Sequence, residues 1–151
     1  MGFAMIMGGA IAGASERLLS ILDEFGHELG VALQMFDDLG NVIGKCEPFK
    51  RYEDIELYRP SWVWACAANS NTPEAYEQFC TAVGRLPDAR ELEIWIEEHD
   101  LVQRVRASAR RQLDSAFRRL EQRLERHEIH WSKRAFEELR QPGEEITIAY
   151  G

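Results

Sequence analysis

A long amphipathic segment constrains the fold of this chain most strongly. Between Leu101 and His127, apolar residues recur at every third or fourth position, and arginine, glutamate and glutamine fill most of the others. This period is typical of an α-helix that buries one face. The arginines could form a stripe that binds phosphate or nucleic acid. They could also form a solvated face whose charge neighbouring acids compensate, and we favour this second interpretation.

The rest of the chain also has helical patterns. Ser15 and Thr72-Pro73 are typical helix starts, and Gly40 is a candidate helix end. Only the last segment, 145–150, resembles a strand, and it is expected to be a tail or a lone strand. The sequence therefore predicts an all-α helical bundle in a single domain over residues 1–151, with helices at about 2–14, 16–40, 60–70, 73–85, 88–98, 100–128 and 131–140. The only plausible break is the loop at about 42–58.

Composition limits the classes of partner and compartment. The chain has 18 Lys and Arg against 26 Asp and Glu, a net charge of −8. Nucleic-acid binding relies on basic side chains that neutralise phosphates, so nucleic acid is not an expected partner. The three cysteines form no C-x-x-C pair, which disfavours a zinc or redox site. Reduced thiols and the lack of a recognisable leader predict a cytoplasmic protein.

The N-terminal segment is apolar but short. Its apolar run covers about 13 residues, whereas a membrane-spanning helix needs roughly 20. No transmembrane segment is therefore expected, and a buried helix at 2–14 fits better. Its glycines would allow another helix to approach closely.

Two adjacent acids, Asp37 and Asp38, lie near the end of the predicted helix 16–40. Carboxylates at a helix C-terminus face the negative end of the dipole and also repel each other. A bound divalent cation would reverse both penalties, and Mg²⁺ combines carboxylate oxygens with water and substrate phosphates. A plain solvated helix end is the alternative. Nearby cations could neutralise a metal-bound diphosphate, or could simply belong to a solvated loop.

These residues resemble a known family. The segment LGVALQMFDDLGN, residues 29–41, is similar to the second aspartate-rich motif of trans-polyprenyl diphosphate synthases. EDIELYRPSW, residues 53–62, resembles the lysine-containing segment that follows this motif in the family. MGGAIAGAS resembles the small-residue helix that precedes it. The resemblance covers about residues 1–70, and the order and spacing of the two motifs make it more specific than either alone.

The resemblance implies a helical bundle around a central cavity, here half of an isoprenoid-synthase-like fold. It implies a prenyltransferase that joins a prenyl diphosphate to isopentenyl diphosphate with Mg²⁺ as cofactor. Its implied site residues are Gln34 near the reacting allylic group, Asp37, Asp38 and Asn41 as metal ligands, and Lys50, Arg51 and Arg59 as diphosphate contacts.

Three departures from the family pattern matter. Asn41 replaces the third acid of the motif, and Tyr58 stands where the family usually has glycine. The chain also begins where the second half of the family begins, and nothing in it matches the first aspartate-rich motif. The resemblance therefore implies half an active site. The chain could be one subunit of a split enzyme completed by a second protein chain, a fragment of a longer enzyme, or a partner that has lost catalysis. A half-bundle would expose apolar faces of the helices at 2–14 and 16–40, which a partner would cover.

Three other functions remain open. The chain could ionise a prenyl diphosphate as a terpene synthase does, without elongation. It could be a non-catalytic regulatory subunit that shapes the cavity of a partner. It could also be an unrelated helical interaction protein with an accidental acid pair. Retention of Gln34, Asp37, Asp38 and Arg59 favours chemistry over a purely structural role.

Overall fold

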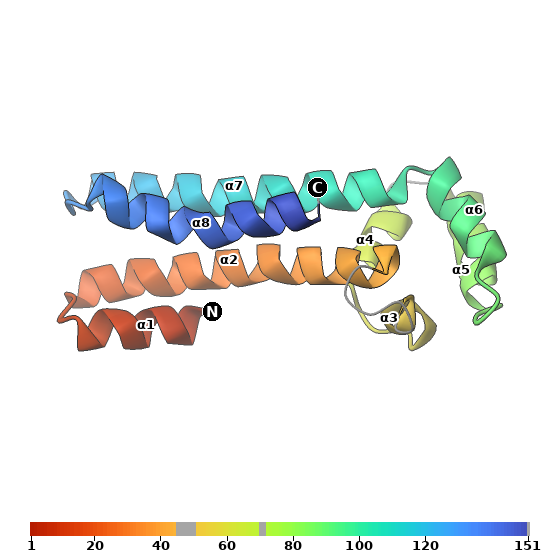
Figure 1. Ribbon diagram of the computed structural model, residues 1–151, viewed down its shortest axis with the longest axis horizontal. Coiled ribbons are helices and arrows are strands. Elements are labelled where there is room, and N and C mark those ends of the chain that lie inside the picture. The colour runs from red at the N-terminus through yellow and green to blue at the C-terminus, as the bar shows by residue number, and fades with distance from the viewer. Residues whose placement is uncertain (45–50, 70–71, 151) are drawn as a thin grey trace. The chain divides into compact units, whose positions relative to one another are not determined.

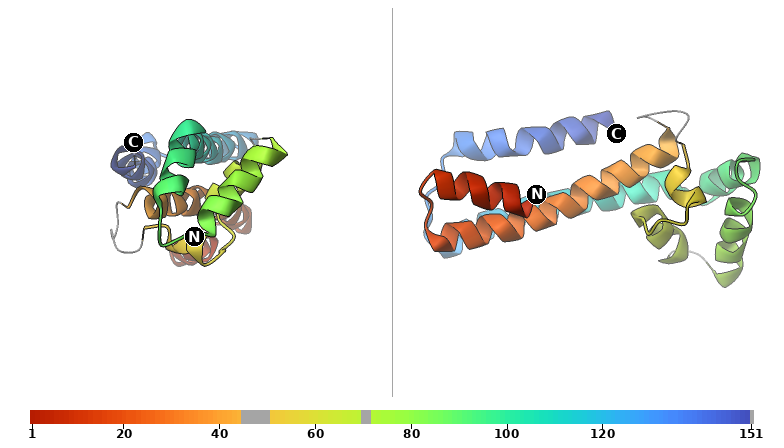
Figure 2. Two further views of the ribbon diagram at one scale, coloured as in Figure 1. Left: turned by 90° about the vertical axis from the view of Figure 1, so that its right-hand side faces the viewer. Right: turned by 90° about the horizontal axis from the view of Figure 1, so that it is seen from below.

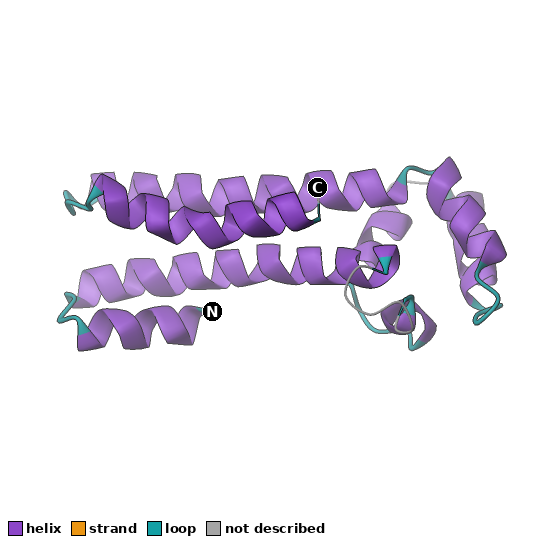
Figure 3. Ribbon diagram, viewed as in Figure 1, coloured by secondary structure: helices purple, strands orange, loops and turns teal. Residues whose placement is uncertain are grey.

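A computed structural model describes residues 1–44, 51–69 and 72–150. These residues form helices and no strand (Figure 3), which confirms the all-α prediction. The helices are α1 (Gly2–Ile11), α2 (Glu16–Ile43), α3 (Glu53–Glu56), α4 (Trp62–Asn69), α5 (Pro73–Val83), α6 (Arg90–Glu98), α7 (Leu101–Arg126) and α8 (Lys133–Ala149).

Two predicted helix starts are confirmed by their capping bonds. The Ser15 hydroxyl accepts a hydrogen bond from the Leu18 N–H at 3.3 Å. The Thr72 hydroxyl accepts one from the Ala75 N–H, also at 3.3 Å, and Pro73 is the first residue of α5. Both bonds satisfy an N–H that has no partner within the first turn of a helix.

Three predicted boundaries are wrong. Gly40 does not end α2, which continues to Ile43 and is followed by Gly44 in the left-handed region at φ 66°. The expected loop at 42–58 contains α3. The segment 145–150, predicted as a tail or lone strand, mostly forms the end of α8. The less exposed residues in this part of the chain recur with a helical period, from Leu139 through Gly143, Ile146 and Thr147 to Tyr150.

The described residues form two compact units, and the first comprises residues 1–34 and 109–150. In this unit α1 lies beside the start of α2, and α8 lies beside α7 (Figure 1). The approach of α1 to α2 is close, because a Cβ added to Gly26 would lie 2.6 Å from the Cα of Gly2. Phe117 on α7 contacts Phe25 on α2, with ring centroids 5.2 Å apart, and Phe136 on α8, at 5.9 Å. These rings form the core of the unit.

The second unit, Met35–Ser108, contains α3 to α6, the end of α2 and the start of α7. Its core is an aromatic cluster centred on Phe79, which is fully buried. The Phe79 ring lies 4.9 Å from Trp64 on α4 and 4.8 Å from Trp95 on α6, measured between centroids. The Trp95 indole N–H donates to the Ala75 carbonyl at 2.9 Å. These contacts join α5 to α4 and α6 (Figure 2).

Helix α1 presents an apolar face to solvent. Phe3, Met7 and Ile11 share one side of this helix and are 76%, 48% and 83% exposed. The apolar residues of α2, by contrast, are largely buried, Leu22, Phe25 and Leu29 among them. The expected exposed face is therefore present on α1 and absent from α2. Within the described ranges, no helix has both the length and the hydropathy to cross a membrane.

Candidate functional site

The two adjacent aspartates near the end of α2 have different environments. Asp37 is exposed, whereas Asp38 is only 7% exposed. The Asp38 Oδ2 accepts a hydrogen bond from the backbone N–H of Trp62 at 2.6 Å. Trp62 is the first residue of α4, where backbone N–H groups lack partners within their own helix. One oxygen of Asp38 is therefore used within the protein.

Asn41 and Gln34 lie on the same helix as the two acids. The Asn41 Oδ1 accepts a hydrogen bond from the Asp54 N–H at 3.4 Å, and its carbonyl accepts one from the Tyr52 N–H at 3.2 Å. Asn41 thus contacts the residues around the start of α3. Gln34, one turn before the acids, is exposed.

The predicted diphosphate contacts that the structure describes are paired with acids of the chain itself. Arg51 donates to the Val42 carbonyl at 2.8 Å and to the Glu93 carboxylate at 2.7 Å. Arg59 donates to the Asp54 carboxylate at 2.8 Å, and this hydrogen bond raises the pKa of Arg59 above its usual value. Lys50 lies outside the described residues.

Tyr58, directly before Arg59, has an unusual backbone conformation. Its φ is 53°, in the left-handed region that favours glycine. The structure therefore keeps, with a tyrosine, a backbone conformation suited to the glycine that the resembling family usually has here. Arg59 follows this residue directly.

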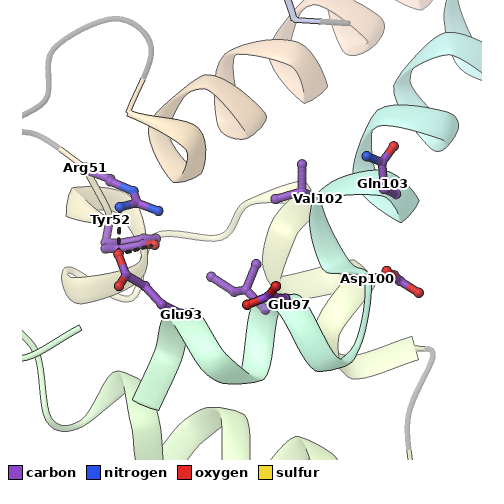
Figure 4. A pocket seen from close by; sticks show the side chains of 8 residues that line it. Arg51, Tyr52, Glu93, Glu97, Asp100, Val102 and Gln103 are labelled. Carbon is purple, nitrogen blue, oxygen red and sulfur yellow. Dashed lines mark hydrogen bonds and ion pairs between the residues drawn. The ribbon is translucent and has the colours of Figure 1, made fainter. Parts of the chain in front are cut away.

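A pocket of about 370 Å³ lies in the second unit beside Arg51 (Figure 4). Its charged lining is mainly acidic, which does not suit a diphosphate: it comprises Arg51, Tyr52, Glu93, Ile96, Glu97, Asp100, Val102 and Gln103. Burial, with a further contribution from Glu93, raises the pKa of Tyr52 to about 12. Sequence reasoning missed Glu93, because it lies 42 residues from Arg51 and no local pattern links them.

The side chains described above do not form a complete magnesium site. Asp37 is a suitable ligand, but Asp38 and Asn41 each use one oxygen on a backbone N–H. In the part of the chain that the structure describes, no group of three or more His, Cys, Asp or Glu side chains could hold a metal ion. Magnesium usually requires more oxygen ligands than Asp37 alone can supply.

Comparison with protein families identifies the chain. The sequence model of the family described as polyprenyl synthetase matches residues 1–97, which is more than half of the 151 residues. The chain belongs to the polyprenyl synthetase family. Every candidate site residue lies inside the matched range. Comparison with curated proteins finds no match, and comparison with solved structures finds none either.

Membership of the polyprenyl synthetase family agrees with the all-α fold. It is a family of prenyltransferases, whose members bind prenyl diphosphates and isopentenyl diphosphate and generally depend on Mg²⁺. The match ends at residue 97, so all of α7 and all of α8 lie beyond it.

Proposed function

We propose that this chain is a subunit or C-terminal part of a prenyl diphosphate synthase. It would take part in magnesium-dependent transfer of a prenyl group to isopentenyl diphosphate in the cytoplasm, together with a partner chain. The observation that carries the proposal is the polyprenyl synthetase match over residues 1–97. The exposed carboxylate of Asp37 on α2, inside this range, supports a catalytic role.

Asp37 would be the main metal ligand from this chain. Because the described acids do not complete a magnesium site, carboxylates of the partner chain would supply the remaining ligands. Gln34, exposed on the same helix, would lie near the allylic group of the substrate.

Lys50, Arg51 and Arg59 would contact the diphosphate. Both arginines are now paired with carboxylates, but the side chains of the Arg51–Glu93 pair are 41% and 46% exposed, and that of Arg59 is 55% exposed. Ion pairs as exposed as these contribute little to stability, because water and salt screen them. A diphosphate carries more charge than one carboxylate and accepts several hydrogen bonds, so it can replace these acids as the arginines' partner.

The exposed face of α1 supports a partner chain. Phe3, Met7 and Ile11 line it, and α1 contains no charged residue that burial would desolvate. Complete burial of such side chains contributes roughly 1.5–3 kcal/mol each relative to full exposure. A partner that covers this face would therefore gain several kcal/mol from these residues.

A non-catalytic regulatory subunit is the second candidate. One observation favours it: Arg51 and Arg59 are both bound to acids of the chain itself. In this case the chain would shape the cavity of a catalytic partner without binding the diphosphate.

The test is a prenyl-transfer assay on the assembly isolated from its natural source. It measures incorporation of labelled isopentenyl diphosphate into products of an added allylic diphosphate. Asp37→Ala should lower the rate by roughly 100-fold or more, because it weakens the binding of a metal ion that stabilises transition-state charge by several kcal/mol. Asp114→Ala, which removes an exposed acid on α7, is the matched control and should leave the rate unchanged. Full activity of the Asp37 variant would replace the catalytic proposal with the regulatory one.

A further inference from the structure

The segment Asp54–Trp62, which carries Arg59, is bonded to side chains of α2 near both of its ends. Near its start, the Asp54 N–H donates to the Asn41 side chain at 3.4 Å. At its end, the Trp62 N–H donates to the Asp38 carboxylate at 2.6 Å. Both acceptors belong to the sequence motif that resembles a metal-binding motif.

The Asp38 contact has the chemistry of a helix-capping interaction. Its carboxylate is buried, and it lies on the first N–H of an eight-residue helix, where the helix dipole favours negative charge. A hydrogen bond to an ionised acceptor is stronger than a neutral one. A buried carboxylate with such a partner is well suited to hold the start of α4 in place.

The Asn41 contact explains why an amide replaces the family's acid. The N–H that it binds belongs to α3, a helix of four residues of which three are acids, Glu53, Asp54 and Glu56. A carboxylate at position 41 would add a further negative charge beside this acidic turn, and like charges repel. An amide oxygen accepts the same hydrogen bond without that charge.

Arg59 lies between the two attachment points. Its side chain donates to the Asp54 carboxylate at 2.8 Å, and its backbone N–H donates to the Asp54 carbonyl at 2.9 Å. These two hydrogen bonds therefore fix the position of Arg59 relative to Asp54.

From this geometry we infer that Asp38 and Asn41 are positioning residues for Arg59. The inference rests on the proposed function for the role of Arg59 as a diphosphate contact. The attachment itself does not depend on that function.

The first test measures amide hydrogen exchange on the full chain by NMR. Asp38→Ala should accelerate exchange at the Trp62 N–H by roughly 10- to 100-fold, the loss expected for a hydrogen bond to a charged group. Asp38→Asn keeps an acceptor oxygen and should restore most of the protection. Asp37→Ala is the matched control and should leave this amide unchanged. Equal exchange in Asp38→Ala and the native chain would overturn the inference.

Asn41→Ala provides a second variant if Asp38→Ala fails to fold. It should accelerate exchange at the Asp54 N–H, and it does not change the acid pair at 37 and 38. Unchanged exchange at this amide would contradict the attachment at Asn41 and hence the inference.

The second test measures kinetics of the assembly. Arg59→Ala should raise KM for the diphosphate substrate, and Asp38→Ala should raise it as well. Adding Asp38→Ala to Arg59→Ala should cause little further increase, because both act through the same cation. Additive increases would overturn the positioning role. If the native assembly shows no prenyl transfer, the proposed function fails, whereas the exchange experiment still decides whether Asp38 and Asn41 hold the segment.

Discussion

The close approach of α1 to α2 predicts opposite effects of the same substitution at two glycines. An alanine Cβ at position 26 would lie 2.6 Å from the Gly2 Cα and 2.8 Å from the Gly2 nitrogen, and both are backbone atoms. They can move away only if α1 moves. At Gly8, which also lies within a helix, nothing stands within 4 Å of the added Cβ.

The magnitudes follow from two terms. In both variants, alanine should stabilise its helix by about 0.5–1 kcal/mol relative to glycine. In Gly26→Ala, overpacking against the backbone should cost about 1–3 kcal/mol. We therefore expect Gly8→Ala to be more stable than the native chain. Gly26→Ala should be less stable than Gly8→Ala by about 1–3 kcal/mol, which is the overpacking term alone.

Urea unfolding followed by circular dichroism at 222 nm measures both variants. The free energy of unfolding comes from linear extrapolation, and the two variants should share one denaturant slope. If Gly26→Ala were as stable as Gly8→Ala, the close packing of α1 on α2 would be refuted.

Two further predictions concern Tyr52 and the face of α1. Burial raises the pKa of Tyr52 to about 12, so its stabilising contribution should be complete below pH 10 and lost as pH rises towards 12. Absorbance at 295 nm should show a late-titrating tyrosine that is lost in Tyr52→Phe, and this variant should reduce the loss of stability in this range. Phe3→Ser and Ile11→Ser should change the stability of the isolated chain by less than about 0.5 kcal/mol, because both side chains are exposed. In the native assembly, native mass spectrometry should show that both variants weaken association with the partner chain. Ile94→Ser, which replaces an exposed residue on α6, is the control and should leave association unchanged. Unchanged association of both α1 variants would exclude this face as the contact.

The helical pattern of the sequence was enough to predict most of the fold. Long periodic segments such as 101–127 are reliable because many positions agree on one face. The four-residue α3 is too short to show a period. The end of α8 was misjudged because alternation at 145–150 outweighed a helical spacing that begins further upstream.

The candidate site was less predictable because it depends on contacts between distant residues. The acid pair suggested two equivalent ligands, but Asp38 is buried and accepts a hydrogen bond from the backbone N–H of Trp62, 24 residues later. Arg51 gave no sign that Glu93, 42 residues away, is its partner. Local spacing identified Asp37 as a candidate, but only the folded chain distinguishes it from its neighbour.

The central claim is that this chain contributes one part of a prenyltransferase site and that a different chain contributes the rest. Native mass spectrometry of the protein isolated from its own source tests this claim most directly. We predict a second, different chain at a fixed ratio, and that chain should contain the carboxylates that the described residues lack. A lone chain or a homo-oligomer would contradict the claim.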